Sequence, residues 1–377
     1  MKVIYTHFST DLQSDSAGFN TTKDLAFILS LSVEYSKKYY KDIQLVTNKR
    51  GKELLIDKYK VGFTSVDTSL EGLECPQDLF AWAKIKAYSL QKEPFISIDL
   101  DAIVWEKIPT RFLKAPLFFQ NNEPFAIQQG YTYLTKLIST TTVAYFCRRL
   151  KTSQAYNCGI IGINNLDLIK EWYRIAEDLI FNPENQHFWA SLENKTQMNY
   201  IFEQYFIACI AKNEGLENEV KFLIKDVDYK NVSKPKLQLT HLWGDSKRKQ
   251  SELIKLKERL KKEFPRKYKH INSIEVNPKE VYASFFYKGT QKWQRTLNYF
   301  LLNNKIKSIV YLCYDGKKSS RLINEFGEIT DFIYTNNFPK CDLAIIKDAL
   351  PIWTGKEYVN FCAKNEAKYI MDNRQVI

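Results

Sequence analysis

The sequence is poor in glycine and proline, and it has no long apolar run. Thirteen Gly and eleven Pro among 377 residues exclude collagen-like chains and disordered chains rich in these residues. No stretch approaches the roughly 20 uncharged apolar residues that a membrane-spanning helix needs. The apolar window 201–210, for example, is interrupted by Glu203 and Gln204.

Paired cysteines and an export signal are also lacking. The seven Cys are odd in number, scattered, and include no CxxC pair. The apolar run at 1–8 is too short for the core of a signal peptide, and no small-residue cleavage site follows it. We therefore expect reduced thiols and a cytoplasmic protein.

The composition and length fit a globular chain with more than one domain. Apolar residues make up 45% of the chain and aromatic residues 14%, enough to bury large cores. At roughly 150 residues per domain, the length predicts two or three domains. The parts that we expect are 1–248, a helical linker at 249–280, and a small unit at 281–377.

Strand-like and helix-like segments alternate along the first two thirds of the chain. The strand-like segments are 3–8, 43–47, 95–101 and 157–165, and the helical ones are 22–39, 51–59, 80–90, 166–180 and 196–212. This alternation predicts an α/β domain with a parallel sheet. Ligands of such sheets bind at the carboxyl ends of the strands.

Two acids stand at such a strand end. Asp99 and Asp101 are two positions apart, so their side chains point the same way on an extended segment. Two carboxylates at this place can hold one divalent cation. The alternative is a pair of loop acids, one of which caps a helix.

A second polar motif places His241, Gly244 and Lys247 at spacings of three. An imidazole can complete a carboxylate metal site and shifts its preference from Mg²⁺ toward Mn²⁺. Glycine lets the backbone approach a phosphate, and lysine offers a mobile positive charge to phosphate oxygens. Together these groups suit a diphosphate leaving group, although His241 taken alone also fits a structural histidine.

The net charge of +12 is concentrated in one segment. Residues 246–270 hold eleven Lys and Arg against three Glu, a net charge of +8, which argues against a general nucleic-acid binder. Leu253, Leu256, Leu260 and Phe264 form one stripe of an amphipathic helix in this segment. The segment either docks on an anionic membrane or lipid-linked acceptor, binds an anionic polymer, or packs its stripe as an ordinary solvated helix.

A second α/β unit is expected from 281 onward. Its segments are helices at 290–303, 319–325 and 357–365, and strands at 308–313, 329–334 and 342–347. The unit faintly resembles a degenerate methyltransferase Rossmann core. The turn after its first strand has only Gly316, followed by Lys317 and Lys318, so we expect no S-adenosylmethionine binding and a role in acceptor binding or dimerisation.

Four blocks, in order, resemble the GT-A glycosyltransferases of the galactosyltransferase and glycogenin type, often called family eight. The blocks are Ile98-Asp99-Leu100-Asp101, Asn157 to Asn164 with Trp172 after it, Glu203-Gln204, and His241-x-x-Gly244-x-x-Lys247. The similarity covers about residues 1–250. It implies a GT-A, Rossmann-like domain and a metal-dependent transfer of a sugar, with retention, from a nucleotide-diphosphate sugar to a glycan, lipid-linked or protein acceptor.

The resemblance implies a role for each matched residue. Asp99, Asp101 and His241 would hold Mn²⁺ or Mg²⁺. The donor, most simply a UDP-sugar, would be bound by Thr6, His7, Lys84, Asp99, Asn157, Gly244 and Lys247, with Thr6 and His7 near the base.

The catalytic candidates that the resemblance implies are Gln204, Glu203 and Asp101. A neutral Gln204 near the anomeric carbon fits a retaining transfer, which needs no strong base. If Glu203 points into the site, it could serve as nucleophile or base. The alternative for the Glu203–Gln204 pair is an exposed helix face.

The sequence departs from the family pattern in three places. Glu-Gln replaces Asp-Gln with Tyr205 in place of a following acid, no Pro-Trp follows Lys247, and the end of the first strand matches poorly. The last departure leaves the base open.

Rival functions remain. A nucleotidyltransferase of similar fold needs a Gly- and Arg-rich phosphate loop, which residues 6–11 lack. A bifunctional glycosyltransferase–methyltransferase and a non-catalytic polyanion binder are the others. We expect no nucleic-acid partner, and we leave open a homodimer and a peripheral membrane contact through 246–270.

Overall fold

The computed structural model describes residues 1–10, 15–19, 21–76, 78–124, 129–149, 152–192, 194–224, 239–242, 244–248 and 250–275, with five strands farther on. The chain divides into two compact units, one of residues 1–9 and 26–264, the other of residues 10–25 and 265–377. The domain boundaries expected from the sequence stay a prediction.

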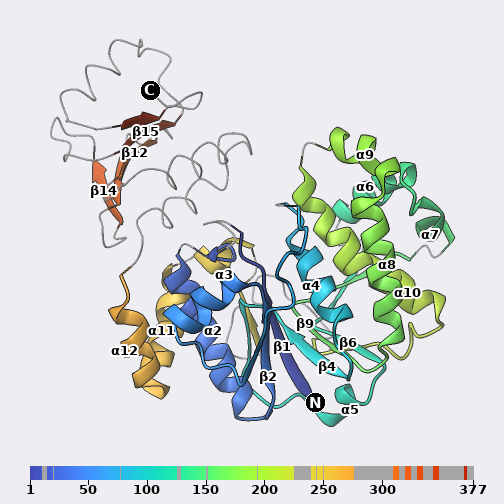
Figure 1. The fold of residues 1–377 in the computed structure, drawn as a ribbon, viewed down its shortest axis with the longest axis horizontal. Coiled ribbons are helices and arrows are strands. Elements are labelled where there is room, and N and C mark those ends of the chain that lie inside the picture. Colours follow the sequence, from blue (N-terminus) through green and yellow to red (C-terminus); the bar gives the residue numbers. More distant parts are fainter. Residues whose placement is uncertain are drawn as a thin grey trace. The chain divides into compact units, whose positions relative to one another are not determined.

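A seven-stranded sheet in the order β10-β6-β9-β4-β1-β2-β3 forms the middle of the first unit (Figure 1). Its strands are β1 (Lys2–His7), β2 (Ile43–Thr47), β3 (Ser65–Asp67), β4 (Phe95–Ile98), β6 (Leu117–Phe119), β9 (Ile160–Ile163) and β10 (Lys221–Phe222). Neighbours from β4 to β3 pair in parallel, and β9 pairs antiparallel with both β4 and β6. This mainly parallel sheet among helices confirms the predicted α/β fold class.

Short strands and helices complete the first unit. The strands are β5 (Ala102–Val104), β7 (Asn122–Pro124), β8 (Gln154–Tyr156) and β11 (Leu239–His241). The helices are α2 (Thr22–Lys37), α3 (Lys49–Lys52), η1 (Glu53–Lys58), α4 (Phe80–Ser89), α5 (Thr110–Leu113), α6 (Gln129–Leu137), η2 (Ile138–Thr140), α7 (Ala144–Arg149), α8 (Asp167–Phe181), η3 (Pro183–Asn185), α9 (Gln186–Ser191), η4 (Lys195–Gln197), η5 (Tyr200–Tyr205), α10 (Phe206–Asn213), η6 (Gly244–Arg248) and α11 (Gln250–Glu263).

The central strands β4 and β9 are buried along their whole length and apolar except for Ser97, as expected of a sheet covered on both faces. On one face they pack against α4, α8 and α10, where Trp172 donates its indole N–H to the Phe202 carbonyl at 2.6 Å. On the other face the Tyr5 hydroxyl bonds Ser32 and Ser36 of α2 at 2.8 and 2.9 Å. These layers hold the carboxyl ends of β1 and β4 in fixed places.

Two predicted helices differ in detail from the observed ones. The segment predicted at 51–59 begins as α3 and continues as the π-helix η1, and the segment predicted at 196–212 contains η4, the π-helix η5 and then α10. A π-turn shifts the following side chains around the helix axis and is frequent at functional sites. The π-helix η5 carries Glu203 and Gln204.

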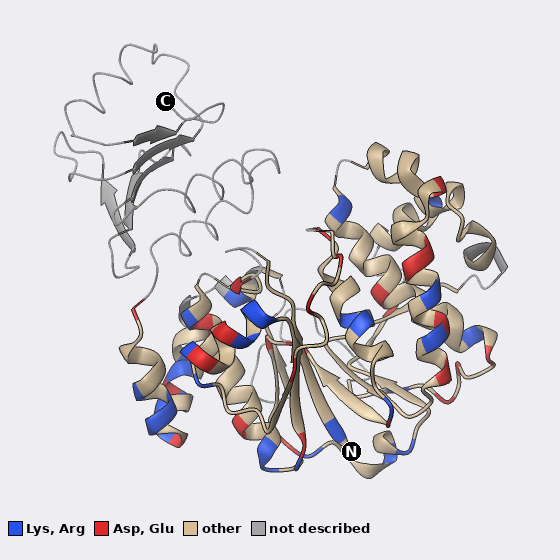
Figure 2. Cartoon of the chain, viewed as in Figure 1, with Lys and Arg blue, Asp and Glu red and all other residues tan. Residues whose placement is uncertain are grey.

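The basic helix predicted before Pro265 is α11. Its Leu253 and Leu260 are fully buried, and the Arg259 guanidinium lies 4.1 Å from the centre of the Trp105 ring. Several of its cations face acids of the same helix, as in the Arg259–Glu263 ion pair at 2.8 Å. Figure 2 shows Lys and Arg interspersed with Asp and Glu on the helices of the first unit. These contacts favour a packed, solvated helix. Among the described residues, no helix is long and apolar enough to cross a membrane.

The second unit contains α12 (Pro265–Ser273) and a five-stranded sheet in the order β14-β13-β12-β15-β16. The strands are β12 (Ile309–Cys313), β13 (Ser319–Ile323), β14 (Ile329–Ile333), β15 (Leu343–Lys347) and β16 (Tyr369–Met371). The strands predicted near β12, β14 and β15 are confirmed. The predicted helices 290–303 and 357–365 and the Gly316 turn lie outside the described residues.

The helix predicted at 319–325 is wrong, because residues 319–323 form β13. Ser319, Ser320 and Ile323 have only modest helix propensity. Every residue of β13 pairs antiparallel with a residue of β12. The sheet therefore gives hydrogen-bond partners to backbone N–H and C=O groups, many of which would lack partners in a short helix. Local sequence preference was too weak here to compete with strand pairing.

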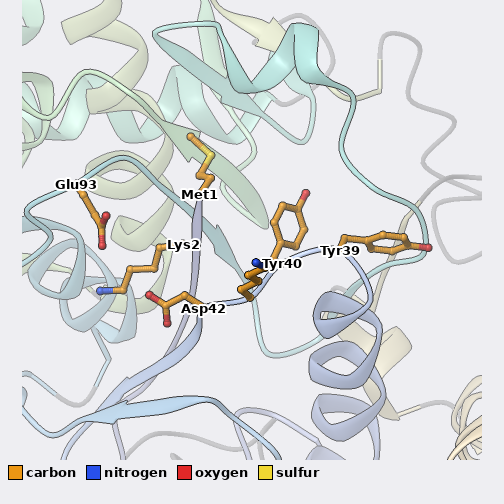
Figure 3. Close-up of a pocket in the computed structure, with 7 residues that line it drawn as sticks. Met1, Lys2, Tyr39, Tyr40, Asp42 and Glu93 are labelled. Atoms are coloured by element: carbon orange, nitrogen blue, oxygen red, sulfur yellow. The ribbon is translucent and has the colours of Figure 1, made fainter.

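A pocket of about 330 Å³ opens at the amino ends of the parallel strands (Figure 3). Lys2, Tyr40, Asp42 and Glu93 are among the residues that line it. Ligands of open α/β sheets bind at the opposite edge, where the strands end. The pocket is therefore no candidate for the donor site.

We expect Gly162→Ala to destabilise the first unit. A Cβ at Gly162 would lie 1.8 Å from Cε1 of the buried Phe118 ring, so a neighbouring strand would have to shift. Overpacking of this kind costs about 1–3 kcal/mol. Urea unfolding of the full chain measures the loss. Gly130→Ala is the matched control, because a Cβ there meets nothing within 4 Å, and equal midpoints for the two variants would contradict this account.

Candidate metal centre and its polar surroundings

Asp99 and Asp101 lie in the turn that leaves the carboxyl end of β4. The Asp99 amide donates to the Gly159 carbonyl at 2.8 Å, and the Ala102 amide donates to the Asp99 carbonyl at 3.0 Å. The strand β5 begins immediately afterwards and pairs antiparallel with β11, which places His241 opposite Ala102. A two-stranded ribbon thus brings His241 to the two acids.

The three predicted metal ligands meet in space. One ligand atom each of Asp99, Asp101 and His241 lies within 4.8 Å of the other two, and His241 Nε2 is 3.3 Å from Asp101 Oδ1. Asp101 and His241 are buried, and Asp99 is partly exposed. Two carboxylates and an imidazole suit Mn²⁺ and related divalent cations. The donor set therefore fits the metal that the sequence led us to expect.

A hydrogen bond fixes the orientation of the His241 ring. The Gln120 amide nitrogen donates to Asn121 at 3.1 Å, so the Gln120 oxygen is the acceptor for His241 Nδ1 at 2.9 Å. Nε2 then faces Asp101. Sequence reasoning missed Gln120, although it directly follows the apolar strand β6.

Gly159 makes room for the same ring. A Cβ there would lie 2.3 Å from His241 Cε1 and 2.8 Å from the Gln120 oxygen. Glycine is therefore required here, because the His241 and Gln120 side chains approach it closely. The sequence gave no sign that these two side chains would meet Gly159.

Lys247 completes the surroundings of Asp101. Its ammonium group lies 2.7 Å from Asp101 Oδ2. Burial raises the pKa of Asp101, but Lys247 and His241 outweigh it and hold that pKa well below its usual range. Gly244, at the start of η6, has φ +54°, a conformation that glycine adopts at no steric cost.

Lys84 of α4 joins Asp99 to Glu203. Its ammonium group is 2.6 Å from Asp99 Oδ1 and also contacts Glu203 Oε1. Burial lowers the pKa of Lys84, but the two carboxylates outweigh it and raise the pKa well above its usual value. Burial raises the pKa of Glu203, and Lys84 opposes that rise. Glu203 and Gln204 are both buried, so the alternative of an exposed helix face is wrong.

A second polar cluster connects Asn157 with Gln204. Asn157 Nδ2 donates to Glu123 Oε1 at 2.7 Å, and the Tyr131 hydroxyl lies within hydrogen-bond distance of Glu123 and of the Gln204 oxygen. Burial, followed by the Glu123 charge, raises the pKa of Tyr131 well above its usual value. Glu123 and Tyr131 were not found from the sequence. Glu123 is the last residue of the polar run 120–123 that follows β6. This run could have identified Glu123 as a candidate site residue.

Thr6 and His7 end β1, the neighbour of β4 in the sheet. The His7 carbonyl accepts a bond from the Thr47 hydroxyl at 2.6 Å, which ties this end to β2. Asn48, next to Thr47, exchanges hydrogen bonds with the Ser9 backbone. The contact of Thr6 and His7 with a nucleotide base stays a prediction.

Comparison with protein families gives one match. Residues 1–274 match a family that is described as a family of unknown function (DUF6734). Among curated proteins, none matches the sequence.

Several solved structures resemble the chain at low identity. The galactosyltransferase LgtC, in complex with donor and acceptor sugar analogues, is 10% identical with a TM-score of 0.39 over 75% of this chain and 100% of that one. Mouse xyloside xylosyltransferase 1 is 9% identical with a TM-score of 0.34 over 64% and 96%. The glycosyltransferase GlyE of Streptococcus pneumoniae is 12% identical with a TM-score of 0.33 over 98% and 90%. Because these scores are low, the function has to come from the site itself.

We expect Gln120→Leu to weaken Mn²⁺ binding about 10- to 100-fold, because it removes the acceptor that orients His241. Electron paramagnetic resonance of free Mn²⁺ measures the affinity. Gln91→Leu serves as control, since the Gln91 amide bonds the Ala87 carbonyl within its own helical segment. An unchanged affinity in Gln120→Leu would show that the His241 ring is not held for metal binding.

Proposed function

We propose that this chain, which belongs to the family of unknown function DUF6734, is a metal-dependent glycosyltransferase that uses a nucleotide-diphosphate sugar. The observation that carries the proposal is the Asp99–Asp101–His241 group with the Lys247 ammonium 2.7 Å from Asp101. This arrangement puts a cation site and a mobile positive charge together at the carboxyl end of a central strand. A departing diphosphate needs both.

Asp99, Asp101 and His241 would hold the metal. A divalent cation bound there supplies Lewis-acid stabilisation of charge on the diphosphate. Lys247, which faces Asp101 in the structure, would turn to the diphosphate oxygens and add electrostatic stabilisation of the departing charge. The positive φ of Gly244 lets the backbone of η6 come close to the same phosphates.

The transfer exchanges one bond at the anomeric carbon for another. The bond from this carbon to the diphosphate oxygen breaks, and its electron pair goes to the diphosphate. An acceptor hydroxyl oxygen forms the new bond to the same face of the carbon, and the hydroxyl proton passes to the departing diphosphate. No strong protein base takes part, and the anomeric configuration is retained.

The contacts of Gln204 and Glu203 support this route. Tyr131 holds the Gln204 oxygen, so the amide N–H groups are left to bind hydroxyls of the donor sugar. Glu203 is paired with Lys84, which weakens it as a nucleophile. Asn157 and Glu123, which are hydrogen-bonded to each other, would add further polar groups that contact the donor sugar. UDP is the donor nucleotide that we favour, with Thr6 and His7 at its base.

We expect Asp101→Asn and His241→Ala each to reduce hydrolysis of UDP-glucose or UDP-galactose by roughly 10²- to 10³-fold, because each removes charge stabilisation of the diphosphate. Excess chelator should have the same effect on the unaltered chain, with rescue by Mn²⁺. Product nucleotide is measured by chromatography. Asp57→Asn, an exposed acid of η1, should keep full activity. Hydrolysis that proceeds at full rate in chelator would contradict a metal-dependent reaction.

We expect the transferred sugar to keep its anomeric configuration, because the neutral Gln204 and the paired Glu203 offer no free base for attack on the opposite face. Proton NMR of the first product formed reads the configuration directly. An inverted product would still be consistent with a glycosyltransferase, but it would contradict the roles proposed here for Gln204 and Glu203.

A further inference from the structure

Two exposed aromatic side chains stand at the starts of two neighbouring helices. Phe80, the first residue of α4, is 58% exposed, and Tyr200, the first residue of η5, is 51% exposed. Each precedes a polar residue of the proposed donor site by four positions, Lys84 in α4 and Gln204 in η5. In the α-helix α4, residues four apart lie on about the same side, about one turn from each other along the axis, so Phe80 lies one turn outward of Lys84. In the π-helix η5, contacts make the link: the Tyr200 ring packs against Tyr131, whose hydroxyl lies within hydrogen-bond distance of the Gln204 oxygen.

Asn199 ties these two helix starts together. Its side-chain oxygen accepts from the Ala81 amide at 2.9 Å, and its Nδ2 donates to the Asp78 carbonyl at 2.7 Å. Asn199 is itself buried. Because Ala81 follows Phe80 and Asn199 precedes Tyr200, this single amide fixes the backbones that carry both rings next to each other.

The Tyr200 ring also continues the polar cluster outward. It packs edge-on against Tyr131, with ring centres 6.4 Å apart and planes at 71°. Tyr131 in turn contacts Glu123 and Gln204 through its hydroxyl. One side of the Tyr200 ring is thus packed against Tyr131, and the side chain is 51% exposed.

We infer that Phe80 and Tyr200 form an acceptor subsite that binds the C–H face of a pyranose ring. This inference rests on the function proposed above. An aromatic face suits the apolar face of a sugar, while the sugar hydroxyls stay in water or bond polar groups. Two half-exposed rings are a small apolar surface, whereas a lipid tail or a protein partner needs a continuous patch of several hundred Å². A sugar acceptor bound outward of Lys84 and Gln204 would present a hydroxyl toward the donor.

The test compares donor hydrolysis, acceptor transfer and direct binding in the full chain. The acceptor probes are methyl β-glycosides of glucose, galactose and N-acetylglucosamine, with UDP-glucose or UDP-galactose and Mn²⁺. Phe80→Ala and Tyr200→Ala should raise the KM for the best probe about tenfold or more, as loss of a central aromatic contact does. Tyr200→Phe should restore binding, because it keeps the ring. Saturation-transfer NMR with UDP and diamagnetic Mg²⁺ follows probe binding without any turnover.

Tyr133→Ala is the matched control. Tyr133 is 60% exposed, but it comes two positions after the buried Tyr131 in α6 and so points to another side of that helix. It should leave both the KM and the NMR signal unchanged.

The outcomes separate this inference from the proposed function. Equal losses in Tyr133→Ala and Tyr200→Ala, or no effect of Phe80→Ala and Tyr200→Ala, would overturn the subsite. If the unaltered chain bound none of the probes, the subsite would also be overturned. If the unaltered chain hydrolysed no donor, the proposed function would fail, and loss of the NMR signal in Tyr200→Ala would still support a sugar subsite.

Discussion

The arrangement of the site depends on one buried carboxylate, that of Asp101. Burying an ionised carboxylate costs several kcal/mol unless charged and hydrogen-bonding partners stand beside it. His241 on β11 and Lys247 on η6 are those partners, and the Leu242 amide donates to the Asp101 carbonyl at 2.9 Å. The strand β11 and the helix η6 are therefore held near the end of β4 by charge, and β11 also by its short pairing with β5.

Lys84 is a second buried charge that needs partners of opposite sign, and its partners connect two helices to the site. It lies between Asp99 and Glu203 and so connects α4, the end of β4 and η5. Three carboxylates and three basic groups balance each other in this small volume. Under the proposed function, Asp99, Asp101 and His241 would hold a divalent cation, and Lys247 would be available to the oxygens of the diphosphate.

Close packing at β9 and at the residue before it gives these charges their positions. Gly159, directly before β9, leaves room for the His241 ring, and Gly162 within β9 leaves room for the Phe118 ring. A methyl group at either place would overlap a neighbour. The π-helix η5 places Glu203 and Gln204 together in the buried interior, where Lys84 and Tyr131 meet them. Small residues and one irregular turn thus decide which side chains meet.

The sequence by itself determined the α/β fold class, the strand before Asp99 and Asp101, and the residue types of the metal centre. Strict local patterns carry this information: apolar runs of strand length, helical periodicity, and polar residues directly after a strand. The four matched blocks also placed His241 and Lys247 with the two acids. Local patterns failed at residues 319–323, where pairing with β12 outweighed weak helix preference.

Only the tertiary structure decided which polar side chains support these residues. Gln120 orients His241, Glu123 and Tyr131 hold Asn157 and Gln204, and each contact joins residues from different elements. The same holds for the burial of Glu203, since its position on η5 is compatible with either an exposed or a buried face until α4 brings Lys84 beside it. Such contacts depend on the way strands and helices pack in three dimensions, and a spacing along the chain does not contain that information.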